Sequence, residues 1–178
     1  MSTSSFGQVV RTDEDVTYTY DGRRYAIDVL LPTYVSVVAC VACALLFWAG
    51  VLRLLTGALF VVAVYSMFNA WVAHAYPRRV TLGKYYVAFE SFGHVDEYPI
   101  PAIRSLAVRE SQGMRAYARI NGGGLTGGRF FLPCSDLRDA DGDDAASLYR
   151  FLLDTEARLD PDGLRVRSRE RWAQEDGR

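Results

Sequence analysis

The chain has 178 residues, of which 50% are hydrophobic, and its 20 Lys and Arg nearly balance 21 Asp and Glu to give a formal net charge of −1. This length leaves room for one small domain beside two membrane helices. The near-zero charge gives no general field for polyanions, which argues against nucleic acid as a partner.

The first 28 residues are interpreted as a cytoplasmic N-terminal segment that contains a β-hairpin. Asp21-Gly22 is a favoured sequence for a type I′ turn, and the residues on both sides alternate as strands do. Pairing outward from this turn sets Tyr18 opposite Tyr25. An isolated two-stranded hairpin is marginal in water, so we expect it to pack against the later soluble domain rather than the membrane surface.

Two apolar runs follow, Val29 to Leu52 and Leu54 to Tyr76, with Arg53 as the single charge between them. Each run has about 24 residues, and about 20 are enough for a helix to cross the hydrocarbon core. A continuous helix would place Arg53 in the bilayer at a cost of about 2.5–3.5 kcal/mol. Residues 29–76 are therefore predicted to form a transmembrane helical hairpin with Arg53 at its tip. A hairpin that re-enters one leaflet is the alternative.

Basic residues flank the two runs, while the turn carries Arg53 alone. They are Arg23 and Arg24 before the first run, and Arg78, Arg79 and Lys84 after the second. The positive-inside bias then predicts an integral protein of the inner (cytoplasmic) membrane with both termini in the cytoplasm. Arg78, Arg79 and Lys84 are also candidate contacts to the membrane surface, where each gains about 1 kcal/mol from anionic lipid. A role as topology determinants alone is the favoured interpretation.

Small residues recur every four positions in the first run, at Ser36, Cys40 and Ala44. Such spacing allows two helices to approach closely, and Asn69 in the second run is expected to hydrogen-bond across the contact. We therefore expect the hairpin to pack on itself, on a second copy or on a protein partner. His74 lies near the cytoplasmic end of the second run, where an interfacial role is favoured over a proton or ion relay.

Six short strands are predicted in the second half of the chain, followed by one helix. The strands are Arg79–Leu82, Tyr85–Ser91, Val95–Ile100, Ile103–Arg109, Met114–Ile120 and Gly128–Leu132. Their lengths and spacing indicate an antiparallel sandwich or barrel. Residues Asp143 to Leu159 have helical periodicity, with Asp143-Asp144 at the N-terminal end. The soluble domain is assigned to 77–160, and residues 161–178 form a polar tail that is mobile or weakly helical.

Four segments of this domain carry a resemblance to a known family. They are Arg79-Val80-Thr81-Leu82, Tyr98-Pro99-Ile100-Pro101-Ala102-Ile103, Phe130-Phe131-Leu132-Pro133 and Leu148-Tyr149-Arg150-Phe151-Leu152-Leu153. Placed after a two-helix hairpin, this order resembles bacterial membrane proteins with a pleckstrin-homology-like domain, including the YcxB-like group. The resemblance implies a partly open barrel closed at one end by the helix, and binding of lipids, peptides or subunits without catalysis. The loop Gly83-Lys84-Tyr85 lacks the basic cluster of phosphoinositide-binding members.

No catalytic residue, cofactor site or metal site is expected. Cys40 and Cys43 form a C-x-x-C pair inside an apolar run, where helix contact is favoured over redox chemistry. The acidic loop 139–144 lacks the spacing of a calcium loop. His94 and Cys134 have no third member of a catalytic set.

The sequence thus predicts an α+β membrane protein, in which a transmembrane helical hairpin precedes the pleckstrin-homology-like domain. The leading hypothesis is a non-enzymatic interaction or scaffolding module on the cytoplasmic face. Its expected partners are the lipid bilayer, a protein or peptide, and a second copy through the hairpin, with inner-leaflet lipid as a further ligand class. The alternative is a small accessory subunit of a transport or channel assembly, with Asn69 and His74 at the contact.

Overall fold

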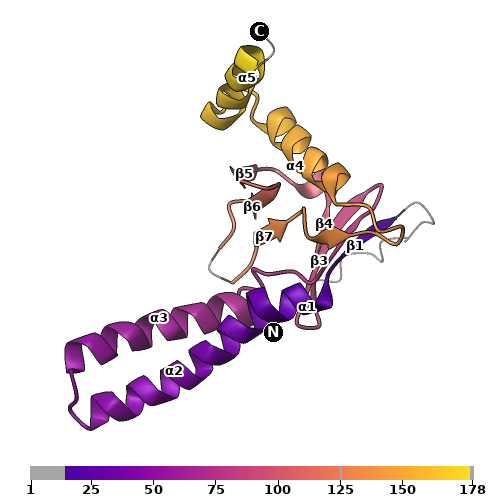
Figure 1. Ribbon diagram of the computed structural model, residues 1–178. Helices are drawn as coiled ribbons and strands as arrows, with labels where there is room; N and C mark the ends of the chain where they lie inside the picture. Colours follow the sequence, from indigo (N-terminus) through magenta and orange to yellow (C-terminus); the bar gives the residue numbers. More distant parts are fainter. Residues whose placement is uncertain (1–14, 125, 177–178) are drawn as a thin grey trace.

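The computed structural model describes residues 15–124 and 126–176, and Figure 1 labels its helices and strands where there is room. It is an α+β fold in which a helical hairpin projects from two antiparallel sheets, with two further helices at the C-terminal end. In chain order the elements are β1 (Val16–Tyr20), α1 (Gly22–Tyr25), the π-helical turn η1 (Ala26–Leu30), α2 (Leu31–Trp48), α3 (Arg53–Trp71), β2 (Arg79–Leu82), β3 (Tyr86–Ser91), β4 (His94–Pro99), the 3₁₀ turn η2 (Ile100–Ala102), β5 (Leu106–Ser111), β6 (Arg115–Ile120), β7 (Arg129–Pro133), β8 (Leu137–Arg138), α4 (Ala146–Leu159) and α5 (Leu164–Asp176).

The helical hairpin is confirmed, with Arg53 at its tip as the first residue of α3. The helical stretch Gly22–Trp48 has 27 residues and α3 has 19, and both are long and apolar enough to cross a membrane. Only 17% of the apolar window of each helix is buried inside the protein, so neither is the core helix of a soluble domain. The helix ends are sharp, because Gly50 and Leu52 adopt positive φ angles of 79° and 42° in the turn.

The predicted β-hairpin around Asp21-Gly22 is wrong, because Asp21 caps a helix instead. Its carboxylate accepts a hydrogen bond from the Arg23 amide at 3.3 Å, and its carbonyl accepts one from the Tyr25 amide at 2.8 Å. An Asp before Gly suits a helix N-cap as well as a type I′ turn. The helix is favoured here because it places Tyr25 and Val29, four residues apart, together in the core.

The preceding strand joins the sheet of the soluble domain. β1 pairs with β2 on one side, with Tyr18 opposite Val80, and with β8 on the other, with Tyr20 opposite Leu137. The expectation that this segment packs on the domain is therefore confirmed for β1. The helical hairpin is an insertion between two paired strands, so two covalent connections attach it to one sheet.

All six predicted strands are present, β2 with the predicted ends and the other five with shifted ends; within the described residues, only the two-residue strand β8 was missed. They form a five-stranded sheet of order β4-β3-β2-β1-β8 and a three-stranded sheet of order β5-β6-β7, which do not close into a barrel. Phe89 and Phe130 stack between the two sheets with ring centroids 4.0 Å apart. Leu148 and Leu152 of α4 complete this core.

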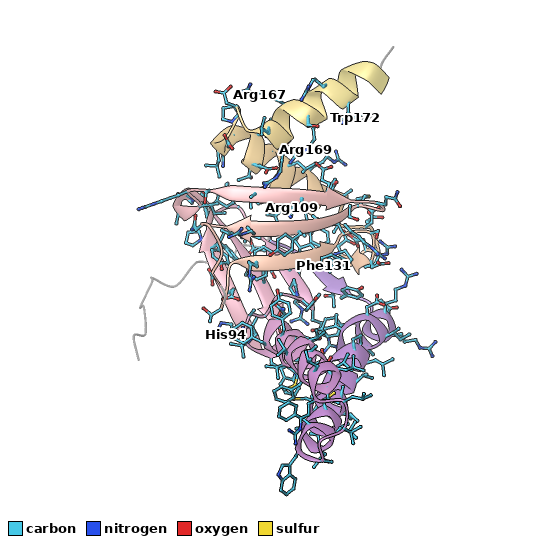
Figure 2. The ribbon with its side chains drawn as sticks, turned by 90° about the vertical axis from the view of Figure 1, so that its left-hand side faces the viewer. His94, Arg109, Phe131, Arg167, Arg169 and Trp172 are labelled. Atoms are coloured by element: carbon cyan, nitrogen blue, oxygen red, sulfur yellow. The ribbon has the colours of Figure 1, made fainter. Side chains whose placement is uncertain are left out.

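The C-terminal part of the chain is more regular than the sequence indicated. The helix α4 begins at Ala146 rather than at Asp143, and Asp144 lies just before it, where its carboxylate accepts from the Ala146 amide at 3.2 Å. The polar tail forms α5, which buries Val166 and leaves Trp172 exposed. Figure 2 shows Trp172 and Arg167 at the end of the protein opposite the hairpin.

Candidate functional site

The two sheets have four edge strands, β4, β8, β5 and β7, and the edges differ in how they are covered. An uncovered edge presents unpaired backbone groups that attract another strand. The edge of β5 is covered by side chains of the C-terminal helices. The Val108 amide donates to Oε1 of Glu156 at 2.9 Å, and Nη2 of Arg169 donates to the Val108 carbonyl at 3.5 Å.

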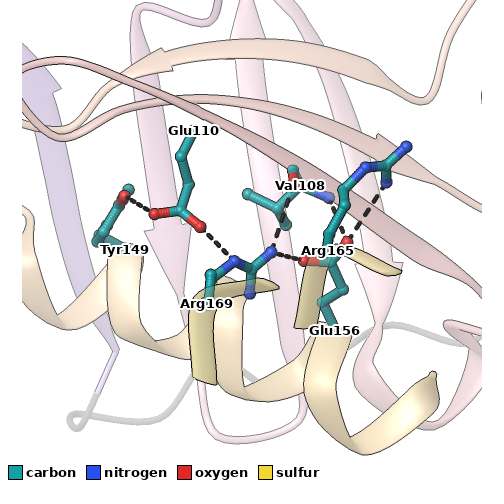
Figure 3. Close-up of polar contacts among 6 residues, drawn as sticks. All are labelled: Val108, Glu110, Tyr149, Glu156, Arg165 and Arg169. Carbon is teal, nitrogen blue, oxygen red and sulfur yellow. Dashed lines mark hydrogen bonds and ion pairs between the residues drawn. The ribbon is translucent and has the colours of Figure 1, made fainter. Parts of the chain in front are cut away.

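A network of charges holds these helices against β5, as Figure 3 shows. The Glu156 side chain is only 4% exposed and pairs with Arg169 and, at 3.5 Å, with Arg165. Arg169 also pairs with Glu110, whose other carboxylate oxygen accepts from the Tyr149 hydroxyl at 2.8 Å. Because the buried carboxylate has both a backbone donor and cationic partners, its desolvation is compensated. α5 is therefore fixed across the β5 edge.

Backbone groups cover the edges of β7 and β8. The Phe131 amide of β7 donates to the Ala75 carbonyl at 2.7 Å, and the Tyr76 ring lies 6.0 Å from the Phe131 ring. The outer side of β8 forms a bridge between Arg138 and Asp144. These two edges are thus closed by the connection after α3 and by the acidic loop.

The outer edge of β4 has no such cover from the described ranges 15–124 and 126–176. The Ile100 amide donates to the Tyr85 carbonyl at 2.8 Å, and the alternation of an antiparallel ladder then directs the backbone groups of Val95 and Glu97 outward. Val95 is 47% exposed. It borders a groove of about 480 Å³ on the outer face of the sheet, which Thr81 also lines. Among the described residues, β4 is the edge strand without such cover.

The start of β4 also carries a cluster of metal-ligating side chains. The chain has two histidines, and the fold stacks their rings, with the centroids of His74 and His94 4.5 Å apart and an interplanar angle of 23°. Nε2 of His94 lies 3.3 Å from Oδ1 of Asp96, two residues along the same strand face. One ligand atom from each of the three residues falls within 4.8 Å of the others.

His74 is held in this position by the backbone around it. It follows the end of α3 and has a positive φ of 48°, and its carbonyl accepts from the Ser91 hydroxyl at 3.1 Å. Burial, and secondarily His94, lower the pKa of His74, while Asp96 opposes this shift. This shift favours the neutral form of the imidazole.

The candidate membrane-surface residues lie in two places. Arg78 and Arg79 are exposed where the chain leaves the hairpin, and Nη1 of Arg79 pairs with Oε2 of Glu90 at 3.1 Å. Lys84 lies at the other end of β2, where it lines a depression with Arg150 and Arg158 of α4. The strand thus separates Lys84 from the two arginines.

The candidate helix-packing residues also differ in their surroundings. Ser36 and Asn69 hydrogen-bond within their own helices, to the Pro32 and Tyr65 carbonyls at 2.8 and 3.0 Å. Cys40 is half-buried and Ala44 is exposed. The buried residues of the two helices are Thr33, Cys43, Thr56, Ala63 and Ala70. The contact between α2 and α3 therefore follows the line of Cys43, which lies next to the predicted line of Ser36, Cys40 and Ala44.

The remaining reactive groups have structural roles. Cys134 is fully buried, and this burial raises the pKa of its thiol to about 12, so it is not a nucleophile at neutral pH. In the acidic loop, Oδ1 of Asp139 accepts from the amides of Asp141 and Asp143 at 3.0 and 2.9 Å. This carboxylate orders the loop.

Within the described part of the chain, these features define an α+β protein with two helices suited to a membrane, one open strand edge and a cluster of two histidines and an aspartate beside it. Comparison with protein families, curated proteins and solved structures finds no match to this chain.

Proposed function

We propose that the protein is a membrane-anchored interaction module, whose β4 edge recruits an extended segment of a protein partner at the cytoplasmic face of the inner membrane. The observation that carries this proposal is the unequal treatment of the strand edges. β5, β7 and β8 are covered by contacts within the chain, whereas Val95 and Glu97 of β4 present their backbone groups outward. Within residues 15–124 and 126–176 three edges are closed and one is open, and an open edge can accept a strand from a partner.

The exposed apolar surface of the hairpin supports the anchor. A helix of 19 residues such as α3 is about 28 Å long, close to the hydrocarbon thickness of about 30 Å. Trp48 ends α2 beside the tip and Trp71 ends α3 at the domain side, as expected for two interfacial aromatic belts. Arg78 and Arg79 follow Trp71 at the domain side, and the positive-inside bias therefore supports a cytoplasmic position for the domain.

Binding at β4 would follow the strand-addition mode. An added antiparallel strand would form hydrogen bonds with Val95 and Glu97, and alternate side chains would lie over the groove beside Val95 and Thr81. Pro99 ends the edge because it has no amide hydrogen. Such a short edge provides few hydrogen bonds, so we expect a weak and reversible contact that the membrane anchor strengthens by raising the local concentration.

The resemblance to pleckstrin-homology-like domains remains part of the proposal. Antiparallel strands followed by α4 agree with the expected order, and peptide recognition is among the functions that the resemblance implies. No observation on the described residues supports the alternative of an accessory subunit. Asn69 bonds its own helix, and His74 lies after the end of α3, stacked on His94.

Photo-crosslinking in intact membranes tests the proposal. A photoreactive residue at Glu97 should give a reproducible crosslink to a protein, whereas the same residue at Arg158, on the exposed side of α4, should not. Equal yields at both positions, or a crosslink to lipid alone at Glu97, would contradict it.

The anchor is tested separately by labelling single cysteines in a background without Cys40, Cys43 and Cys134. An impermeant reagent should label Leu52→Cys at the hairpin tip in intact cells, and Asp162→Cys only after the inner membrane is opened. The reverse pattern would overturn the orientation. Labelling of neither position in intact cells would favour a hairpin that re-enters one leaflet.

A further inference from the structure

We propose that His74, His94 and Asp96 bind a divalent transition-metal ion, with Zn²⁺ as the best fit, where the chain passes from α3 to β4. The histidines are 20 positions apart, and they are the only two in the chain. The fold nevertheless stacks their rings and sets a carboxylate beside them. Figure 2 shows His94 at the end of the domain that meets the helices.

The spacing of the donor atoms suits a small cation. In tetrahedral zinc sites the metal–ligand distance of about 2.0–2.2 Å separates neighbouring ligand atoms by about 3.4 Å. Nε2 of His94 and Oδ1 of Asp96 are already 3.3 Å apart, and the widest separation in the cluster is below 4.8 Å. Small rotations of half-exposed side chains close that gap, without movement of the strands.

The donor set selects the kind of metal. Two imidazoles and one carboxylate match the preference of Zn²⁺ and related ions, whereas Ca²⁺ and Mg²⁺ require sites made of oxygen ligands. The carboxylate of Asp96 offsets half of the charge of a divalent ion. Three protein ligands leave a fourth position for water or for a ligand from a partner.

A bound ion would join the two parts of the protein. His74 belongs to the connection that leads from α3 to β2, and His94 and Asp96 belong to β4. The backbone at His74 is already fixed by its bond to Ser91 and by its left-handed conformation, so the ligand is presented on an ordered segment. We therefore expect metal to stiffen the junction between the hairpin and the open edge.

The test is a titration of the full-length protein in detergent micelles, purified without a polyhistidine tag and treated with chelator. We expect one Zn²⁺ per chain by calorimetry, and a visible absorption band of tetrahedral type with Co²⁺ as the probe. His74→Asn and His94→Gln should each weaken binding at least tenfold, about 1.4 kcal/mol. Asn is chosen at position 74 because it tolerates a positive φ. Asp96→Asn, which replaces the third ligand, should also weaken binding. Asp139→Asn, in the acidic loop, is its matched control.

Circular dichroism and metal-free melting temperatures close to those of the wild type show that the variants fold. The proposal is overturned if wild-type protein binds no Zn²⁺ at micromolar concentration, or if either histidine variant retains wild-type affinity. It is also overturned if Asp139→Asn weakens binding as much as the histidine variants do, because the acidic loop would then be the site.

Discussion

Removing Arg169 tests how the β5 edge is closed. In Arg169→Ala the carboxylate of Glu156 stays buried, keeps the Val108 amide, and has only Arg165 at 3.5 Å as a cationic partner. Loss of one member of a fully buried ion pair costs about 3–5 kcal/mol. Because Arg169 is 24% exposed and Arg165 remains, we expect Arg169→Ala to lower the free energy of local opening by about 2 kcal/mol, which is about a 30-fold change in the opening equilibrium.

Hydrogen exchange followed by mass spectrometry measures this opening directly. Peptides that cover β5 and α5 should exchange about 30-fold faster in Arg169→Ala, since local opening governs the exchange of protected amides. The matched control is Arg167→Ala on the same helix, which removes an exposed pair with Asp162 at 3.3 Å and should change exchange by about twofold or less.

Neutralising the Glu156 carboxylate in the Arg169→Ala background gives the double variant that tests the same pair. Adding Glu156→Gln to Arg169→Ala should recover part of the protection, because the neutral amide needs no cation and its oxygen still accepts from Val108. Equal exchange in the two arginine variants would refute the claim that the buried carboxylate holds α5 on the edge. So would a double variant less protected than Arg169→Ala alone.

Three further predictions concern the core of the domain. Burial raises the pKa of Tyr98 and of Cys134 to about 12. Folding favours their neutral forms, so these two groups should leave the melting temperature unchanged near neutral pH and lower it as pH rises from about 9 toward 12, less steeply in Tyr98→Phe. A melting temperature that does not fall above pH 9 would contradict this. N-ethylmaleimide at about pH 7.5 should leave Cys134 unmodified until the protein is denatured, as peptide mapping would show. Gly128→Ala should lower the free energy of unfolding by about 2 kcal/mol, measured by urea titration, because its φ is +72° and a Cβ would meet the Ile120 carbonyl at 2.8 Å. Gly124→Ala should be near neutral, because a Cβ there would make only an ordinary van der Waals contact, with the Thr126 amide nitrogen at 4.0 Å.

The helical hairpin and the strands could be predicted from local properties of the sequence. Apolar run length and a single charge at Arg53 define the helix turn, and period-two alternation with glycine turns defines the strands. The segment at Asp21-Gly22 could not be assigned in this way, because its local sequence suits both a type I′ turn and a helix start. What decides is the burial of Tyr25 and Val29, and this depends on a sheet built from residues far along the chain.

The histidine cluster could have been found from the predicted strands. In an antiparallel meander of β2, β3 and β4, the residues before β2 and at the start of β4 lie at the same end of the sheet. That places His74 and His94 at one end, and Asp96 shares a strand face with His94. The contact between the two histidine rings could not be predicted, because it depends on the bend of the connection after α3. The contacts that cover the β5 edge could not be predicted from the sequence. They depend on the pair of Glu156 with Arg169, and Arg169 lies in a segment that was interpreted as a polar tail.

The central claim is that β4 binds a partner through its outward backbone groups, and a proline at Val95 tests it most directly. Val95→Pro removes an amide hydrogen that faces away from β3, so the edge is altered while pairing with β3 is kept. Val95→Thr is the control that retains this hydrogen. With the photoreactive residue at Glu97 in intact membranes, we expect the protein crosslink to be lost in Val95→Pro and kept in Val95→Thr. A crosslink of wild-type yield in Val95→Pro would contradict strand addition at this edge.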